Sequence, residues 1–209
     1  MLRFTYLSFL FLSVKLFAQI NNPSITDNTF LFSFKSNSYV ITDDSIYRIV
    51  NNKGWIGLEH NLLIKDFIFF HDNTKGYLMH NSGGVIYDFD GDNFNRIDDS
   101  FEFNTQYQSF PFIYNNSIYN FGGYGLFTFK NIITYFNESK KETELVNIKT
   151  PASKHPIGRK KMFAQLVENK LYIGSGFGYD TNIEDGYKKG GVFEDYWFFD
   201  FKSKEWNKI

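Results

Sequence analysis

The sequence predicts an all-β domain, and three observations lead to this class. Aromatic residues recur at every second position, the period of a half-buried strand, in the segments Phe30–Phe34, Phe110–Tyr114 and Trp197–Phe201. The one stretch of helix-forming composition, Glu138–Leu145, is polar and too short for a stable helix, so we interpret it as a turn between strands. The third observation is that tyrosine-bearing strand segments recur along the chain.

The first 18 residues have the organisation of a secretory signal peptide. Arg3 precedes an apolar run from Phe4 to Val14, and small and apolar residues lead to Ala18. The run is shorter than the roughly 20 residues that span a bilayer. We therefore expect cleavage near Ala18 and a secreted or periplasmic protein without a further membrane span. An uncleaved anchor or a first buried strand is the alternative.

Composition narrows the function classes. The 209 residues carry 22 Lys and Arg against 23 Asp and Glu, a net charge of -1, which lacks the basic excess of a general nucleic-acid binder. Cysteine is absent, which excludes disulfides, thiolate metal sites and cysteine nucleophiles. Aromatic residues make up 21% of the chain and predict a packed core. The residues after Ala18 are enough for one domain, and no linker composition divides them.

The chain contains four repeats of uneven length. Each has a strand segment with a tyrosine, at Tyr39, Tyr77, Tyr119 and Tyr172. Downstream of the second and fourth, Tyr87–Ile97 aligns without gaps on Phe199–Ile209, and Phe136–Thr143 and Tyr47–Trp55 are weaker copies. Such self-similarity predicts repeated supersecondary units that pack on one another.

The last two repeats resemble the kelch family of β-propellers. Asn116–Gly123 and Asn169–Gly176 each combine a strand with closely spaced glycines, and the fourth repeat continues with Tyr196–Asp200 and Trp206. The resemblance implies that Gly122, Gly123, Gly174 and Gly176 lie where strands crowd, and that Tyr119, Tyr172 and Trp206 pack between blades. It extends over residues 30–209 and implies four blades, at residues 30–64, 65–108, 109–150 and 151–209. Thr143 replaces the tryptophan in the third repeat.

Four blades leave two ways to complete a propeller. The chain forms a four-bladed ring closed by Phe30–Phe34 joining the last blade, or an incomplete propeller finished by a continuation or by a second copy of the chain. Self-association is therefore an expected partnership, because open edges invite assembly.

Two groups of residues are candidates for a site. Asp88, Asp90 and Asp92 alternate as calcium ligands do, although the same residues suit a turn between strands. The longest loop, residues 177–192, gathers stacking, acceptor and cationic groups, and its candidate ligand-binding residues are Phe177, Tyr179, Asp180, Asp185, Tyr187 and Lys188.

No residue set in the sequence has the pattern of a catalytic one. We therefore expect a non-catalytic, exported kelch-like module that binds a protein or a glycan through its loops and uses no cofactor. The family resemblance leaves open a sugar epimerase similar to the sialic-acid mutarotases, with Arg159 and His155 as its candidates. Galactose oxidase chemistry is excluded because it needs a cysteine. A third alternative is a truncated sensor domain without independent function.

Overall fold

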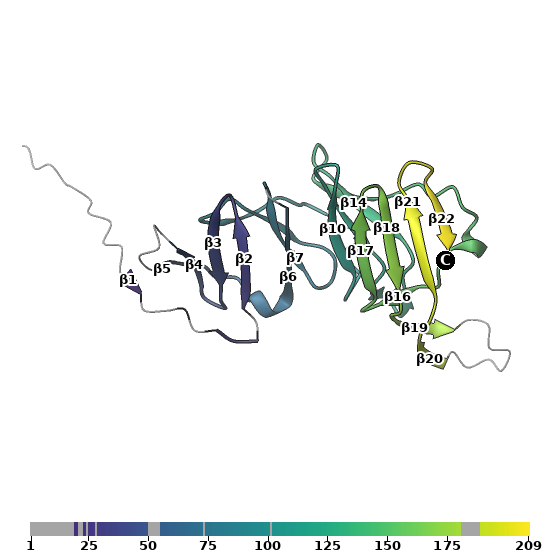
Figure 1. Ribbon diagram of the computed structural model, residues 1–209, viewed down its shortest axis with the longest axis horizontal. Coiled ribbons are helices and arrows are strands. Elements are labelled where there is room, and N and C mark those ends of the chain that lie inside the picture. The colour runs from purple at the N-terminus through teal and green to yellow at the C-terminus, as the bar shows by residue number, and fades with distance from the viewer. Residues whose placement is uncertain are drawn as a thin grey trace, which may run out of the picture.

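The computed structural model describes residues 19–20, 23, 25–27, 29–49, 55–72, 74–100, 102–180 and 189–209. The predicted signal peptide, residues 1–18, lies outside the described residues. Four antiparallel sheets follow one another along the chain and stand side by side in a row (Figure 1). The only helices in the described part are two short 3-10 turns, Ile64–Asp66 (η1) and Ala152–Lys154 (η2). The all-β prediction is confirmed.

The first two sheets occupy the N-terminal half of the row. Sheet 1 contains β2 (Phe30–Phe34), β3 (Asn37–Ile41), β4 (Ser45–Ile49) and β5 (Trp55–Glu59), with β1 (Gln19–Ile20) paired to β5. Sheet 2 contains β6 (Phe67–His71), β7 (Gly76–His80), β8 (Ile86–Phe89) and β9 (Phe94–Arg96).

The last two sheets carry small additions. Sheet 3 contains β10 (Phe110–Tyr114), β11 (Ser117–Phe121), β14 (Ile133–Asn137) and β15 (Glu142–Leu145). Sheet 4 contains β17 (Phe163–Val167), β18 (Lys170–Gly174), β21 (Tyr196–Asp200) and β22 (Glu205–Lys208). The pair β12 (Tyr124–Gly125) and β13 (Thr128–Phe129) is separate, as is a three-stranded sheet of β16 (Arg159–Lys160), β19 (Phe177–Asp180) and β20 (Lys189–Val192).

Each main sheet is a meander, which gives the row two distinct ends. The hairpin turns between the first and second strands and between the third and fourth strands lie at one end, which we call the turn end. The links between second and third strands, and those between sheets, lie at the other, which we call the connection end. Residues 138–141 form such a hairpin turn, but Glu142–Leu145 is strand β15, so the expected turn is right only in its first half.

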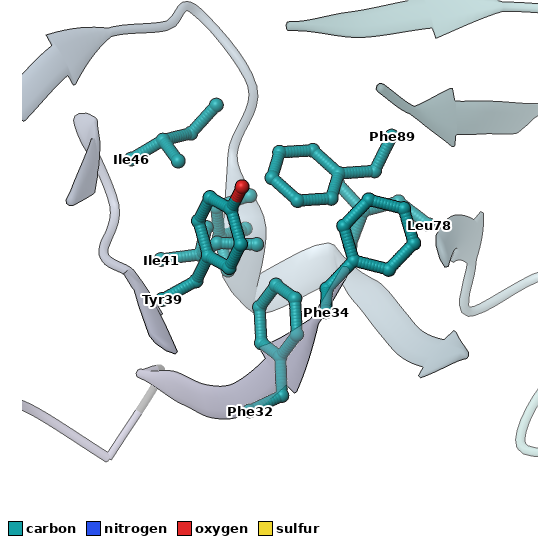
Figure 2. Packing of buried hydrophobic residues seen from close by; sticks show 8 residues of the cluster. Phe32, Phe34, Tyr39, Ile41, Ile46, Leu78 and Phe89 are labelled. Atoms are coloured by element: carbon teal, nitrogen blue, oxygen red, sulfur yellow. The ribbon is translucent and has the colours of Figure 1, made fainter. Parts of the chain in front are cut away.

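Aromatic side chains hold sheet 1 against sheet 2. Phe34, Tyr39 and Ile41 point toward Leu78 and Phe89 from the neighbouring sheet (Figure 2). The Tyr39 and Phe89 rings meet edge to face with centroids 5.2 Å apart. Burial of each such side chain contributes about 1.5–3 kcal/mol, so this cluster is a principal source of stability.

A second aromatic cluster joins sheet 3 to sheet 4. Trp206 packs on Phe121 and Phe199, with ring centroids 5.3 Å away in both cases. The first strands are also neighbours, because β10 lies against both β6 and β17. The sheets stack in this way because the repeats have the same strand pattern, so that each sheet presents an apolar face to each neighbouring sheet.

The junction between sheets 2 and 3 contains a polar layer beside a smaller apolar cluster. The buried Gln106 amide donates to the Gly122 carbonyl at 3.0 Å and accepts from the Thr134 hydroxyl at 3.0 Å. Asn120 is also buried, and its side-chain amide has no hydrogen-bond partner in the described part of the chain. A polar group buried in this way costs free energy, so Asn120 lowers the stability that this junction contributes.

The four repeat tyrosines occupy one structural position. They lie in the second strands of successive sheets, β3, β7, β11 and β18. Tyr39, Tyr77 and Tyr119 each face the following sheet, because each belongs to the cluster at that junction. Tyr172 has the same place in sheet 4, on a face that none of the three clusters includes.

The gapless alignment of the two aromatic hairpins is wrong by two residues. Phe89 pairs with Phe94 in sheet 2, and Phe199 pairs with Trp206 in sheet 4. Phe89, and not Tyr87, is therefore the equivalent of Phe199, and the turn of sheet 2 is two residues shorter. Side chains two positions apart lie on the same face of a strand, so both alignments put aromatic residues in register.

The described residues do not form a closed ring. Sheet 1 and sheet 4 lie at opposite ends of the row (Figure 1), and β2 pairs only with β3. The ring closed through Phe30–Phe34 is thus absent from this arrangement. Within the described ranges, no helix has the length and apolar character needed to cross a membrane.

Candidate functional site

A hollow of about 490 Å³ opens at the turn end, between sheets 2 and 3. Four hairpins contribute to it, including the turn of sheet 1 that carries Lys35. Its wall holds four cations and three carboxylates, on Lys35, Lys75, Arg96, Lys141, Asp88, Asp90 and Glu138. Its apolar part comes from Tyr77, Phe89 and Phe136, which are buried in the adjacent clusters.

Lys75 and Tyr77 form the polar centre of this hollow. The Lys75 ammonium lies 3.5 Å from Glu138 Oε1 and is hydrogen-bonded to the Tyr77 hydroxyl. Burial disfavours the charge of Lys75, but the Tyr77 hydroxyl and the Glu138 carboxylate outweigh it and raise the pKa of Lys75. Burial raises the pKa of Tyr77. At neutral pH the pair therefore presents an ammonium and a neutral hydroxyl.

Among the carboxylates in the wall of the hollow, Asp88 has a buried oxygen without a described hydrogen-bond partner. Its Oδ1 atom is buried and has no hydrogen-bond partner among the residues that the structure describes. Asp90 is different, because its Oδ1 accepts from the backbone amides of Asp92 and Asn93 at 2.9 and 2.8 Å. These bonds hold the turn and lower the pKa of Asp90 although burial opposes this. Asp88 therefore has an unused acceptor in the wall of the hollow.

The three alternating aspartates do not converge on one point. Asp92 forms an ion pair with Arg48 at 3.0 Å, and Asp90 serves the turn. The described ranges contain no group of three or more His, Cys, Asp or Glu residues placed to hold a metal ion. These contacts are the ones expected if the aspartates serve the hairpin, and calcium binding stays a prediction.

The described ends of the long loop of the fourth repeat, β19 and β20, lie at the connection end. Phe177 and Tyr179, on β19, pack around Phe129, with ring centroids 5.7 and 4.8 Å away. Asp180 is described only as a backbone position of β19, and Asp185, Tyr187 and Lys188 lie outside the described residues. The described part of this loop is thus an aromatic hairpin supported by β13.

Arg159 is a structural residue in this arrangement. Its guanidinium is fully buried and forms a bidentate pair with Asp195 at 2.6 and 2.9 Å. It also donates to the carbonyls of Ile157 and Ser175. Burial opposes the charge of Asp195, but Arg159 and the Trp197 indole lower its pKa. No donor of this guanidinium faces solvent.

His155 is the other residue considered for an epimerase. Its Nε2 atom lies 2.7 Å from the Thr150 carbonyl, at the end of η2. It lines a separate shallow hollow with Asn131 and Leu145. The two epimerase candidates therefore belong to different surroundings.

The glycines of the kelch resemblance have steric roles. Gly122 and Gly123 have φ angles of +74° and +95°. A Cβ atom at Gly123 would lie 2.6 Å from the Gln106 carbonyl carbon. At Gly174 it would lie 2.5 Å from the Tyr196 ring, and Gly176 has a φ of +95°. A side chain would be strained by the positive φ angle at Gly122, Gly123 and Gly176, and at Gly174 it would require the Tyr196 ring to move.

No family model and no curated protein sequence matches this chain. The assignment of function therefore depends on the geometry alone.

The sequence indicated Asp88 and Asp90 as candidates, but it did not indicate the hollow that they line or its cations. These cations come from hairpins far apart in the chain, at Lys35, Lys75 and Lys141, and no local motif connects them. The recurrence of lysine in hairpin turns was the only available signal, and such residues are common in turns without any site.

Proposed function

We propose that this protein is an exported, non-catalytic, incomplete β-propeller of kelch type that binds a glycan through its turn-end loops. The observation that carries the proposal is the buried, unpartnered Oδ1 of Asp88 in the wall of the 490 Å³ hollow. A carboxylate in such a place gains from a ligand that donates a hydrogen bond, because a buried polar atom without a partner is unfavourable.

The mixture of groups in the hollow favours a glycan over a protein. Sugar hydroxyls both donate and accept hydrogen bonds, and the wall offers an acceptor at Asp88 and donors at Lys75 and Arg96. Tyr77, Phe89 and Phe136, although nearly buried in the adjacent clusters, give the lining its apolar part, and ligand pockets are lined by such residues. A volume of about 490 Å³ suits a mono- or disaccharide, since small-molecule pockets fall between about 300 and 1,000 Å³.

The environment of Arg159 supports binding without catalysis over an epimerase. A guanidinium whose described hydrogen bonds all go to Asp195 and to backbone carbonyls is not available to a sugar.

Four meander sheets with adjacent first strands support the propeller assignment. Export is supported by the sequence of residues 1–18 and is tested by locating the protein after fractionation of the producing cell.

The binding proposal is tested on an array of neutral, sialylated and sulfated glycans. We expect binding to one class by the parent protein and at least a tenfold loss in Asp88→Asn, about the loss of one charged hydrogen bond. Asp99→Asn is the matched control, because Asp99 is exposed and does not line the hollow. The proposal is wrong if the parent protein retains no glycan, or if both variants bind equally well. Retention of a protein ligand in place of glycans would favour the protein-binding alternative.

A further inference from the structure

The outward face of sheet 4 is apolar and exposed. Phe163, Val167, Tyr196 and Ile209 are 67%, 51%, 57% and 69% exposed. They surround an open hollow of about 440 Å³ that residues of sheet 4 alone line. Monomeric soluble proteins seldom expose a continuous apolar patch of this kind, so the face is a candidate interface.

The same positions are covered in the earlier sheets. In sheet 1 the residues Phe30, Phe32 and Phe34 face sheet 2, and in sheet 3 the residues Phe110, Phe112 and Tyr114 face sheet 4. The corresponding residues of β17 are Phe163, Gln165 and Val167. Beside them Tyr172 has the position of Tyr39 and Tyr119. The face therefore has the pattern of a sheet junction with one of its two sheets missing.

We propose that this face is a dimer interface, at which sheet 4 of one copy of the chain packs on sheet 4 of a second copy about a two-fold axis. A symmetric interface needs only one exposed patch, because the patch pairs with itself. The proposal does not depend on the glycan site, which lies at the turn end of sheets 1 to 3.

Strand register shows why the face complements itself. In sheet 4, Lys170 pairs with Asp200, Tyr172 with Phe198 and Gly174 with Tyr196. Consider a two-fold axis that runs parallel to the strands, outside the exposed face and over the gap between β18 and β21. Rotation about this axis leaves the height of each residue along the strands unchanged, and it places β18 of one copy over β21 of the other. The axis therefore puts Lys170 opposite Asp200 of the partner subunit.

The other levels of the face match as well. Under the same operation Tyr172 lies opposite Phe198 of the partner subunit, and Gly174 lies opposite Tyr196 of the partner subunit. Aromatic residues thus meet aromatic residues, because the Tyr196 ring of each copy already covers its own Gly174 and presents a ring at that level as well. Opposite charges and matched apolar surfaces both favour this pairing.

The opposite face of sheet 1 is a poorer partner for this surface. Val40 and Tyr47, which point away from sheet 2, are only 2% and 9% exposed. A head-to-tail contact between sheet 4 of one copy and sheet 1 of the next would need those side chains uncovered or would be limited to the edge at Leu31, which is 72% exposed on the same face. Sheet 4 is already open, so the symmetric pairing requires no rearrangement.

The test measures the mass of the purified protein in solution by light scattering and sedimentation over a wide range of concentration. We expect a dimer for the parent protein and a monomer for Phe163→Glu. The matched control is Phe127→Glu, because Phe127 is 89% exposed on the β12–β13 loop and should leave the dimer intact. Near-UV circular dichroism checks that each variant keeps the fold, and Ile209→Glu, at another exposed position of the face, should also give a monomer.

A charge reversal tests the two-fold geometry separately. Lys170→Glu would place two acidic side chains opposite each other at the same level, and we expect the dimer dissociation constant to rise about tenfold or more. A parent protein that is monomeric at all concentrations would overturn the proposal. So would a dimer that tolerates both Phe163→Glu and Ile209→Glu, or a mass that grows beyond the dimer with concentration, which indicates a head-to-tail contact.

Discussion

Replacement of Asp195 by alanine should destabilise the protein by about 3 kcal/mol, since removal of one partner of a buried ion pair typically costs 3–5 kcal/mol. The change removes both acceptors of the bidentate bond to Arg159, whose side chain is 0% exposed. It also removes the acceptor of the Trp197 indole, 2.7 Å away. We choose the lower end of the range because Asp195 is 20% exposed, so water replaces part of the lost interaction.

The assay is urea unfolding followed by near-UV circular dichroism, with the free energy extrapolated to water. A loss of about 3 kcal/mol corresponds to a melting temperature lower by roughly 6–12 °C for a chain of this size. Glu194→Ala is the matched control, because Glu194 is the exposed neighbour, and its effect should stay within about 0.5 kcal/mol. An Asp195→Ala protein as stable as the control would refute the structural role of Arg159.

Two further predictions concern a glycine and a turn. Gly123→Ala should destabilise by more than about 1 kcal/mol, because φ is +95° and the new Cβ would lie 2.6 Å from the Gln106 carbonyl carbon. Gly191→Ala, with nothing within 4 Å of its added Cβ, should have little effect in the same urea assay. Asp200 accepts from two backbone amides of its turn, and these bonds lower its pKa. Its contribution to stability is therefore present above its unfolded pKa and lost as the pH falls through the folded one, so the urea midpoint should fall less on acidification in Asp200→Asn than in the parent.

The strands with a strict two-residue period were predictable from the sequence. Phe30–Phe34 and Phe110–Tyr114 are β2 and β10 with the expected limits, because alternate aromatic residues need a buried face. The third segment is shifted by one residue, to Tyr196–Asp200. The tyrosine repeat also located the second strand of every sheet. The two-residue period of the aromatic residues does not determine which residues of two strands pair. For this reason the alignment of Tyr87–Ile97 on Phe199–Ile209 was wrong by two residues.

The site was less predictable than the strands. The hollow depends on which hairpins lie beside one another, and side chains as distant in sequence as Lys35 and Lys141 line it together only because the sheets pack side by side. Likewise the family resemblance offered Arg159 as an epimerase candidate, whereas its partner in the structure is Asp195, 36 residues away. Contacts of this kind follow from tertiary structure and leave no local signature.

The row of sheets has a consequence for how the molecule unfolds. In the described part of the chain each apolar cluster joins one pair of neighbouring sheets, so stability is divided among the sheets and their three junctions, as in a linear repeat protein. The buried Asn120 amide without a described partner costs free energy at the junction of sheets 2 and 3, so we expect this junction to open first. We therefore expect the chain to behave as two coupled folding units, one of sheets 1 and 2 and one of sheets 3 and 4, with amide hydrogens exchanging as two groups with separate free energies of opening.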